Sequence, residues 1–347
     1  MFLSHIFNPL IKMGKFIRFI LVFYTTFCVH VLFAQNPGNT TFADKDTSFI
    51  YHQLQHAQNI YLTYPDSSAE IANDCLYASR KINYRTGIGL SFSVTGHVYW
   101  VKSYNTVSMF YLRNALVYLE QSAPPADIAE CYRMLSRCLT DAHNLKLGWE
   151  YLSKAKQITL TLKNKRLVSA VYNDLARYFS LQKQFDAAID IAKEGIAFAR
   201  SANDTSYLAI LYSRYANILS AMQNYNEAEK YYDSSFTLNI HANNKRLRAI
   251  LYNDFAGLDL MKNNLDECVL NANRSMLLAD TLGAYFIKLE SLNLLLKVYD
   301  RKNDLTKKNQ CLQQLNNFRD SIDYVQNKNN VRLMEEYLWR SNRVSYE

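Results

Sequence analysis

The sequence predicts an all-α protein, a right-handed solenoid of about six to seven helix-turn-helix repeats followed by a long C-terminal helix. Three observations lead to this prediction. Glycine (9) and proline (5) are scarce, which disfavours folds that need many tight turns. Similar segments recur forty residues apart, as in AVYNDLARYFSLQKQFDAA from Ala170 and ILYSRYANILSAMQNYNEA from Ile210. Within each segment the apolar residues follow the spacing of one helix face.

The first 34 residues have the pattern of a signal peptide. Lys12, Lys15 and Arg18 precede an apolar run over residues 19–34. We expect cleavage after residue 34, a flexible linker over residues 35–47, and export to the periplasm or out of the cell. The alternative is an uncleaved membrane anchor over residues 16–34, which would be the only contact with a membrane.

The charge balance disfavours nucleic-acid binding. Removal of residues 1–34 takes away three of the 39 basic residues and none of the 31 acidic ones, so the remaining chain carries a net charge of +5. No run of lysine and arginine of the kind that binds phosphate backbones is present. We therefore expect no nucleic-acid partner.

The cysteines do not form a disulfide pattern. Five remain after the predicted cleavage, at positions 75, 131, 138, 268 and 311, and none has the CxxC spacing. Cys131 and Cys138 are two helical turns apart, about 10 Å, which is too far to bridge. We expect these cysteines to be small buried residues.

The repeats share an apolar anchor and two small residues. The anchors, forty residues apart, are Phe92, Tyr132, Tyr172, Tyr212, Tyr252 and Leu292. Four positions later stand Gly96, Ser136, Ala176, Ala216 and Ala256, and sixteen positions after the anchor stand Ser108, Gly148, Ala188, Ala228 and Cys268. Small residues on both helices of a pair allow the backbones to approach closely. A single pair cannot bury its apolar face, so we expect the pairs to stack.

This unit resembles the tetratricopeptide repeat (TPR). Tyr172, Leu175, Ala176 and Phe179, followed by small residues at positions 188, 192 and 195, match the order of that motif. The period is forty instead of the usual thirty-four, and neither the first tryptophan nor the final proline of the motif is present. Longer helices or longer turns must hold the extra residues. The resemblance covers residues 48–315, and residues 316–347 are expected to form a helical extension.

No combination of residues indicates catalysis. His52 and His56 lie one helical turn apart, but the HExxH glutamate and a third metal ligand are lacking. Asp174 and Asp254 share a repeat position that Arg214 occupies in the repeat between them, so they do not form a carboxylate pair. We expect no enzymatic activity, no metal and no cofactor.

The TPR resemblance implies that the first helix of each pair lines a concave groove. Polar residues beside the repeat anchors are the candidates for ligand contact: His97, Arg133, Arg137, Asn173, Arg177, Ser213, Arg214, Asn217 and Asn253. Amide and guanidinium groups bind extended peptide backbones and carboxylates. We therefore expect a protein or peptide partner, with a preference for acidic ligands.

The expected function is that of an exported TPR-like scaffold for protein–protein or peptide binding. One alternative is the ligand-sensing input domain of a signal-transduction or transcription-regulatory system that lacks its membrane span and output domain. The RDSI sequence from Arg319 and the charged segment after it resemble the end of such sensor domains. A weaker alternative is a surface glycan-binding protein. It would need exposed tryptophans, for which Trp100, Trp149 and Trp339 are available.

Overall fold

The computed structural model describes residues 46–162 and 164–320, and its helices begin at Thr47. The predicted signal peptide (residues 1–34), nearly all of the linker and most of the C-terminal extension lie outside the described residues. The described part consists of helices and turns, without a strand. None of its helices is both long enough and apolar enough to cross a membrane.

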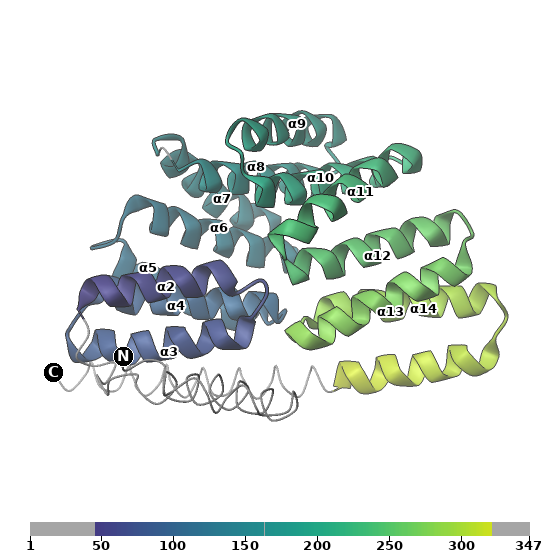
Figure 1. Ribbon diagram of the computed structural model, residues 1–347, viewed down its shortest axis with the longest axis horizontal. Helices are drawn as coiled ribbons and strands as arrows, with labels where there is room; N and C mark the ends of the chain where they lie inside the picture. Colours follow the sequence, from purple (N-terminus) through teal and green to yellow (C-terminus); the bar gives the residue numbers. More distant parts are fainter. Residues whose placement is uncertain (1–45, 163, 321–347) are drawn as a thin grey trace, which may run out of the picture. The chain divides into compact units, whose positions relative to one another are not determined.

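The helices form antiparallel pairs along the chain (Figure 1). The first helices of the pairs are α2 (Thr47–Ile60), α4 (Arg85–Val101), α6 (Pro125–Asp141), α8 (Lys165–Leu181), α10 (Thr205–Ala221), α12 (Lys245–Met261) and α14 (Tyr285–Arg301). The second helices are α3 (Pro65–Lys81), α5 (Asn105–Leu119), α7 (Leu145–Leu160), α9 (Phe185–Ser201), α11 (Tyr225–Ala242) and α13 (Leu265–Leu282). Residues 305–320 are also helical and pair with α14, so this helix crosses the predicted boundary at residue 315. The fold is the predicted TPR-like α-solenoid.

Turns of about three residues separate most helices, and most turns contain one residue with positive φ. These residues are spaced by multiples of twenty: Asn83, Ser103, His143, Lys183, Asn203, Gln223, Asn243, Asn263, Gly283 and Asn303. After Gln223, the N–H of Asn224 donates to the carbonyl of Leu219 at 2.9 Å, which closes the helix end in a Schellman motif. Asparagine and glycine adopt positive φ at the lowest cost, which explains the asparagine-rich turns.

The length of the helices explains the forty-residue period. Both α8 and α9 contain 17 residues, and three residues follow each before the next helix begins. The turns are too short to hold extra residues, so the helices account for the long repeat. Several helices also begin on a capping side chain, as where Asn244 Oδ1 accepts from the N–H of Leu247 at 2.9 Å.

The predicted small positions are buried where the two helices of a pair meet. Ala176, Ala188, Ala216 and Ala228 are fully buried in one apolar cluster. A Cβ atom on Gly96 would lie 2.7 Å from Leu112 Cγ, so a side chain there would push α4 and α5 apart. The five described cysteines are buried with unbridged thiols, which confirms the prediction that they are packing residues.

The first helices contact one another from pair to pair, and the solenoid curves until its ends meet. Thr63, after α2, donates through Oγ1 to the carbonyl of Asn243, before α12, at 2.9 Å. The N–H of Phe286 in α14 donates to Ser103 Oγ, after α4, at 3.2 Å. The first two pairs therefore contact the sixth and seventh, and the first helices form a nearly closed inner face.

The packing of small residues is tested by two substitutions on α9. Ala192 is fully buried and Ala197 is exposed. We expect Ala192→Phe to lower the free energy of unfolding by about 1–3 kcal/mol through overpacking. Ala197→Phe should cost less than about 0.7 kcal/mol, the difference in helix propensity. Urea denaturation followed by circular dichroism measures both, and equal losses would contradict the assigned packing.

Candidate functional site

The predicted groove residues lie on five consecutive first helices, from α4 to α12. Residues one position past the repeat anchors are buried between repeats: Ser93, Arg133, Asn173, Ser213 and Asn253. Residues five positions past the anchors, among them Arg137, Arg177 and Asn217, reach solvent in part. His97, in the same phase, is fully buried. Residues one position past the anchors are therefore enclosed between repeats, whereas most of those five positions past the anchors can be reached by a ligand.

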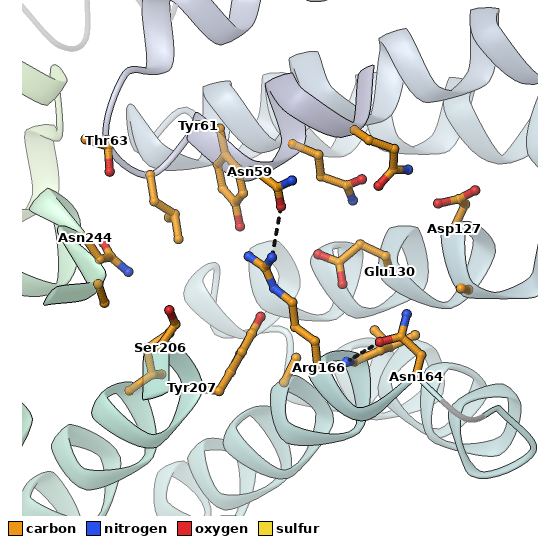
Figure 2. A pocket seen from close by; sticks show the side chains of 18 residues that line it. Asn59, Tyr61, Thr63, Asp127, Glu130, Asn164, Arg166, Ser206, Tyr207 and Asn244 are labelled. Carbon is orange, nitrogen blue, oxygen red and sulfur yellow. Dashed lines mark hydrogen bonds between the residues drawn. The ribbon is translucent and has the colours of Figure 1, made fainter. Parts of the chain in front are cut away.

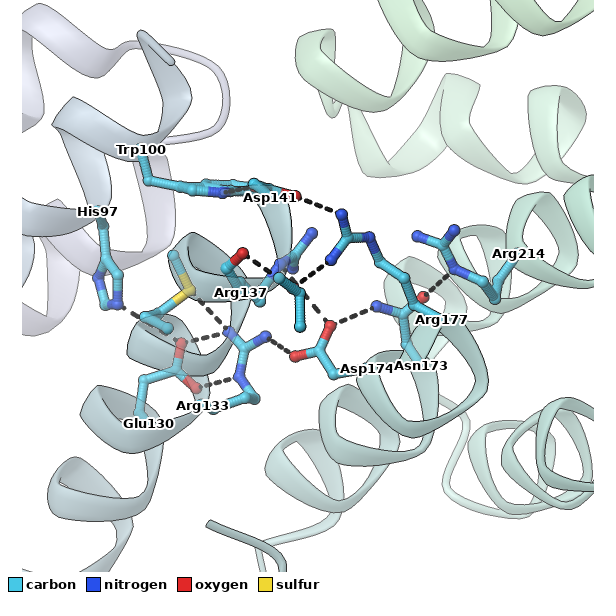
Figure 3. A network of polar contacts seen from close by, with 12 residues as sticks. His97, Trp100, Glu130, Arg133, Arg137, Asp141, Asn173, Asp174, Arg177 and Arg214 are labelled. Carbon is cyan, nitrogen blue, oxygen red and sulfur yellow. Dashed lines mark hydrogen bonds and ion pairs between the residues drawn. The ribbon is translucent and has the colours of Figure 1, made fainter. Parts of the chain in front are cut away.

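Arg133 is the centre of a buried ion-pair network (Figure 3). Its side chain is 1% exposed and contacts Glu130 through Nε at 2.8 Å and Asp174 Oδ2 through NH1 at 2.6 Å. Burial would raise the pKa of Glu130, but the charge of Arg133 outweighs it and lowers that pKa to about 2. Two carboxylates thus neutralise Arg133, which contributes to the packing of α6 against α8.

Contacts between consecutive repeats recur at a separation of forty-one residues. Arg133 contacts Asp174, and Arg214 Nε donates to Asn173 Oδ1 at 3.3 Å. Trp100 Nε1 donates to Asp141 Oδ2 at 2.9 Å. Residues at one repeat period plus one therefore face each other on neighbouring first helices, and the polar contacts follow the inner face from α4 to α10.

Trp100 lies between two guanidinium groups where the ends of the solenoid meet. The Arg137 and Arg246 guanidinium carbons are each 4.2 Å from the ring centroid of Trp100, which is 4% exposed. Arg246 belongs to α12, so this stack joins the second repeat to the sixth. Asp141 also accepts a hydrogen bond from Arg177, whose NH1 donates to Thr140 Oγ1 at 2.6 Å.

Two titratable groups on the inner face have shifted pKa values. Burial, with the neighbouring charges of Arg177 and Arg137, lowers the pKa of Arg214 to about 10, so it stays protonated. Burial and the charge of Glu290 raise the pKa of Asp254 to about 8, so this carboxyl is largely neutral at pH 7. Its Oδ2 is buried and has no hydrogen-bond partner among the described residues.

The remaining predicted residues make structural contacts. Asn253 donates to the carbonyl of Ile287 at 3.0 Å and accepts from Ser291 Oγ at 2.8 Å, which ties α12 to α14. Asn217 accepts from the hydroxyl of Tyr232 at 2.5 Å within its own repeat. Among the nine candidates, the side chains left for a ligand are those of Arg137, Arg177, Arg214 and, in part, Asn217.

Sequence reasoning missed Trp100, Asp141 and Arg246. The forty-one-residue spacing of Trp100 and Asp141 equals that of Arg133 and Asp174, so a search at this spacing could have paired them. No sequence signal places Arg246 beside Trp100, because that contact depends on the curvature of the whole solenoid.

A second candidate site is a cavity of about 210 Å³ at the starts of the first helices (Figure 2). The end of α2 covers it with Asn59 and Tyr61, α6 contributes Asp127 and Glu130, and α8, α10 and the start of α12 complete its wall. Arg166 of α8 donates to Asn59 Oδ1 at 2.9 Å across this space. The cavity adjoins the buried network through Glu130.

The described residues offer no group of three histidine, cysteine or acidic side chains arranged to hold a metal. His52 and His56 are exposed on α2. Of the two described tryptophans, Trp100 is buried, and Trp149 packs against Tyr178 with ring centroids 4.8 Å apart. Neither provides the exposed platform that glycan binding would need.

The chain matches no protein-family model and no curated protein. Among solved structures it is similar to NprR in complex with its cognate peptide NprX, with 16% identity, 87% of this chain and 88% of that chain covered, and a TM-score of 0.61. It is also similar to a Rap protein complexed with Competence and Sporulation Factor, with 12% identity, 81% of this chain and 89% of that chain covered, and a TM-score of 0.59. A third similar structure is a signal transduction ATPase of Pyrococcus horikoshii with a tetratricopeptide repeat sensor. The identity is 14%, the match covers 91% of this chain and 52% of that chain, and the TM-score is 0.52. These similarities establish the TPR-like helical repeat fold.

His97 is buried in its neutral form and links stability to pH. Its ring stacks on Tyr61 with centroids 5.1 Å apart, and its Nε2 lies 3.8 Å from Glu130 Oε1. Burial lowers the pKa of His97 from 6.5 to about 4, since the nearby Glu130 charge only partly opposes burial and the charges of Arg133 and Arg137 act with it. Unfolding at mildly acidic pH therefore takes up a proton.

This linkage predicts a loss of stability on acidification. The contribution of neutral His97 is complete above pH 6.5, the unfolded value, and is lost as the pH falls towards 4. Between pH 7 and pH 5 we expect the parent protein to lose about 2 kcal/mol of stability relative to His97→Phe. The raised pKa values of Asp127 and Asp254 act in the opposite direction but are common to both proteins, so they cancel in this difference. The exposed His56→Phe is the control and should follow the parent protein. Urea denaturation at both pH values decides, and parallel pH profiles of parent and His97→Phe would refute the prediction.

Proposed function

We propose that this protein is an exported, non-catalytic scaffold that binds an acidic peptide or protein segment on the inner face of its solenoid. The arginines Arg137, Arg177 and Arg214 would bind carboxylates of the ligand, and the amide of Asn217 would bind its backbone. The ligand would be an extended segment that runs across α6, α8 and α10.

The observation that supports this proposal most is the incomplete pairing of the arginines on the inner face. Arg137 and Arg177 are each 20% exposed, so their guanidinium groups reach solvent. The carboxylates nearest to them, Asp141 and Asp174, are shared with Trp100 and Arg133. With Asp254 largely neutral at pH 7, additional carboxylates from a ligand would complete the pairing.

The spacing of the arginines favours an extended ligand. Neighbouring packed helices lie about 8–10 Å apart, which corresponds to about three residues of an extended peptide. Each charge-assisted hydrogen bond contributes about 1.5–3 kcal/mol when partly removed from water and much less when solvated. Two such contacts are enough to change affinity by a factor of ten or more.

Solved structures of the same fold support this proposal. NprR, a protein of this fold, was solved with its cognate peptide, and the Rap protein with Competence and Sporulation Factor. A TPR-like solenoid of this size can therefore accommodate such ligands.

Export is proposed on the pattern of residues 1–34 alone. Three basic residues before an apolar run are typical of a secretory signal. N-terminal sequencing of the protein from a cell fraction outside the cytoplasm should begin at Gln35. A sequence that retains residues 16–34 would contradict cleavage.

Binding is tested by selection from a library of random peptides, followed by titration of the best ligands. We expect the selected peptides to be rich in aspartate and glutamate, with affinity that falls as salt rises. Arg177→Ala combined with Arg214→Ala should weaken binding at least tenfold and leave the circular dichroism spectrum unchanged.

The matched control removes two arginines from outside the inner face. Arg113 on α5 and Arg274 on α13 are exposed on second helices. Arg113→Ala with Arg274→Ala changes the net charge equally and should bind as the parent does. Equal effects of the two double variants would show that net charge, and not the inner face, governs binding.

A further inference from the structure

The cavity below the end of α2 contains a carboxylate without a cationic partner. Asp127, in the first turn of α6, lines this cavity and is 8% exposed. Its Oδ2 is buried and has no hydrogen-bond partner among the described residues. No lysine, arginine or histidine of the described residues forms an ion pair with Asp127.

The cations near this carboxylate are engaged elsewhere. Arg133 is paired with Glu130 and Asp174. Arg166 is hydrogen-bonded to Asn59 on the other side of the cavity, as Figure 2 shows. Because Asn59 is neutral, Arg166 forms no ion pair among the described residues either, and Asp127 is the carboxylate of the cavity wall that lacks one.

Its surroundings disfavour an isolated negative charge. Burial and the adjacent Glu130 raise the pKa of Asp127 to about 6, although Gln55 and Tyr51 of α2 act in the opposite direction through hydrogen bonds. The start of α6 also favours an anion, but not enough to offset burial. A positive charge that enters the cavity would relieve both the desolvation and the repulsion between the two carboxylates.

We propose that this cavity binds a primary ammonium group, with Asp127 as its ion-pair partner. Glu130, three residues further along α6, also lines the cavity and adds negative charge to its wall, although both its oxygens already accept from Arg133. An ammonium group has three N–H donors, which suit several oxygen acceptors in one small space.

The size of the site limits the ligand. A volume of about 210 Å³ accommodates a group of the size of one or two amino-acid residues. The ammonium group can belong to the free N-terminus of a peptide or to a small free amine. This site is separate from Arg177 and Arg214, so it does not depend on binding at the inner face, and each can fail without the other.

The first test compares amines with their acetylated forms on the unmodified full-length protein. The probes are ethylamine, L-alanine and tri-L-alanine, titrated by calorimetry and by saturation-transfer NMR up to about 10 mM. Acetylation removes the positive charge and two of the three N–H donors. We expect at least one amine to bind and its acetylated form to bind at least tenfold more weakly.

The probes also distinguish the two possible sources of the ammonium group. Binding of ethylamine or L-alanine assigns the site to small amines, whereas binding of tri-L-alanine alone assigns it to a peptide N-terminus. If none of the amines binds, or if acetylation leaves affinity unchanged, the proposal is overturned.

The second test uses two aspartates that each lie in the first turn of a helix. Asp127→Asn removes the charge in the first turn of α6, and Asp186→Asn removes one in the first turn of α9, where the residue is exposed and outside the cavity. We expect Asp127→Asn to lose at least tenfold in affinity for the bound amine and Asp186→Asn to stay within about twofold. Circular dichroism checks folding, and the acetylation comparison decides if Asp127→Asn does not fold. Parental affinity in a folded Asp127→Asn variant would refute the site.

Discussion

A positive-φ turn residue at intervals of twenty, or a multiple of twenty, keeps the helices of this protein in phase. All of these residues except Asn243 are followed by the same backbone hydrogen bond that closes the helix end, and the next helix begins two residues after each of them. Equivalent side chains of consecutive repeats therefore lie at the same height on neighbouring first helices. A repeat of another total length would shift one first helix along the next, and contacts at forty-one residues, such as Arg133 with Asp174, would be lost.

This regularity allows polar groups to be buried in the solenoid. An isolated buried guanidinium group costs several kcal/mol, but Arg133 meets two carboxylates that the repeat places beside it. Trp100 is held in the same way, by Asp141 from the next repeat and by Arg137 above its ring. The buried residues one position past the repeat anchors thus join neighbouring repeats. The residues five positions past the anchors reach solvent and include arginines with incomplete pairing.

Closure of the solenoid places two candidate sites of opposite charge preference close to its inner face. The second repeat contacts the sixth through Trp100 and Arg246, so helices far apart in the sequence meet at the inner face. The end of α2 covers the starts of α6, α8 and α10 and forms the cavity that holds Asp127. Acidic groups in this cavity and basic groups on the inner face give the two candidate sites opposite preferences, which would suit a ligand with a free ammonium group and carboxylates along its length.

The sequence by itself determined the fold class, the repeat length, the helix pairing and the small residues between helices. These features follow from spacing along the chain, and Ala216 or Cys268 could be assigned as packing residues without coordinates. It also identified the arginines of the first helices as candidates for ligand contact. Only the tertiary structure decided that Arg133 is enclosed while Arg177 reaches solvent, that Arg246 stacks on Trp100, and that α2 covers a cavity. The physical reason is that curvature accumulates from a small rotation at each repeat. No single segment of the sequence specifies that rotation, yet it sets which distant helices meet.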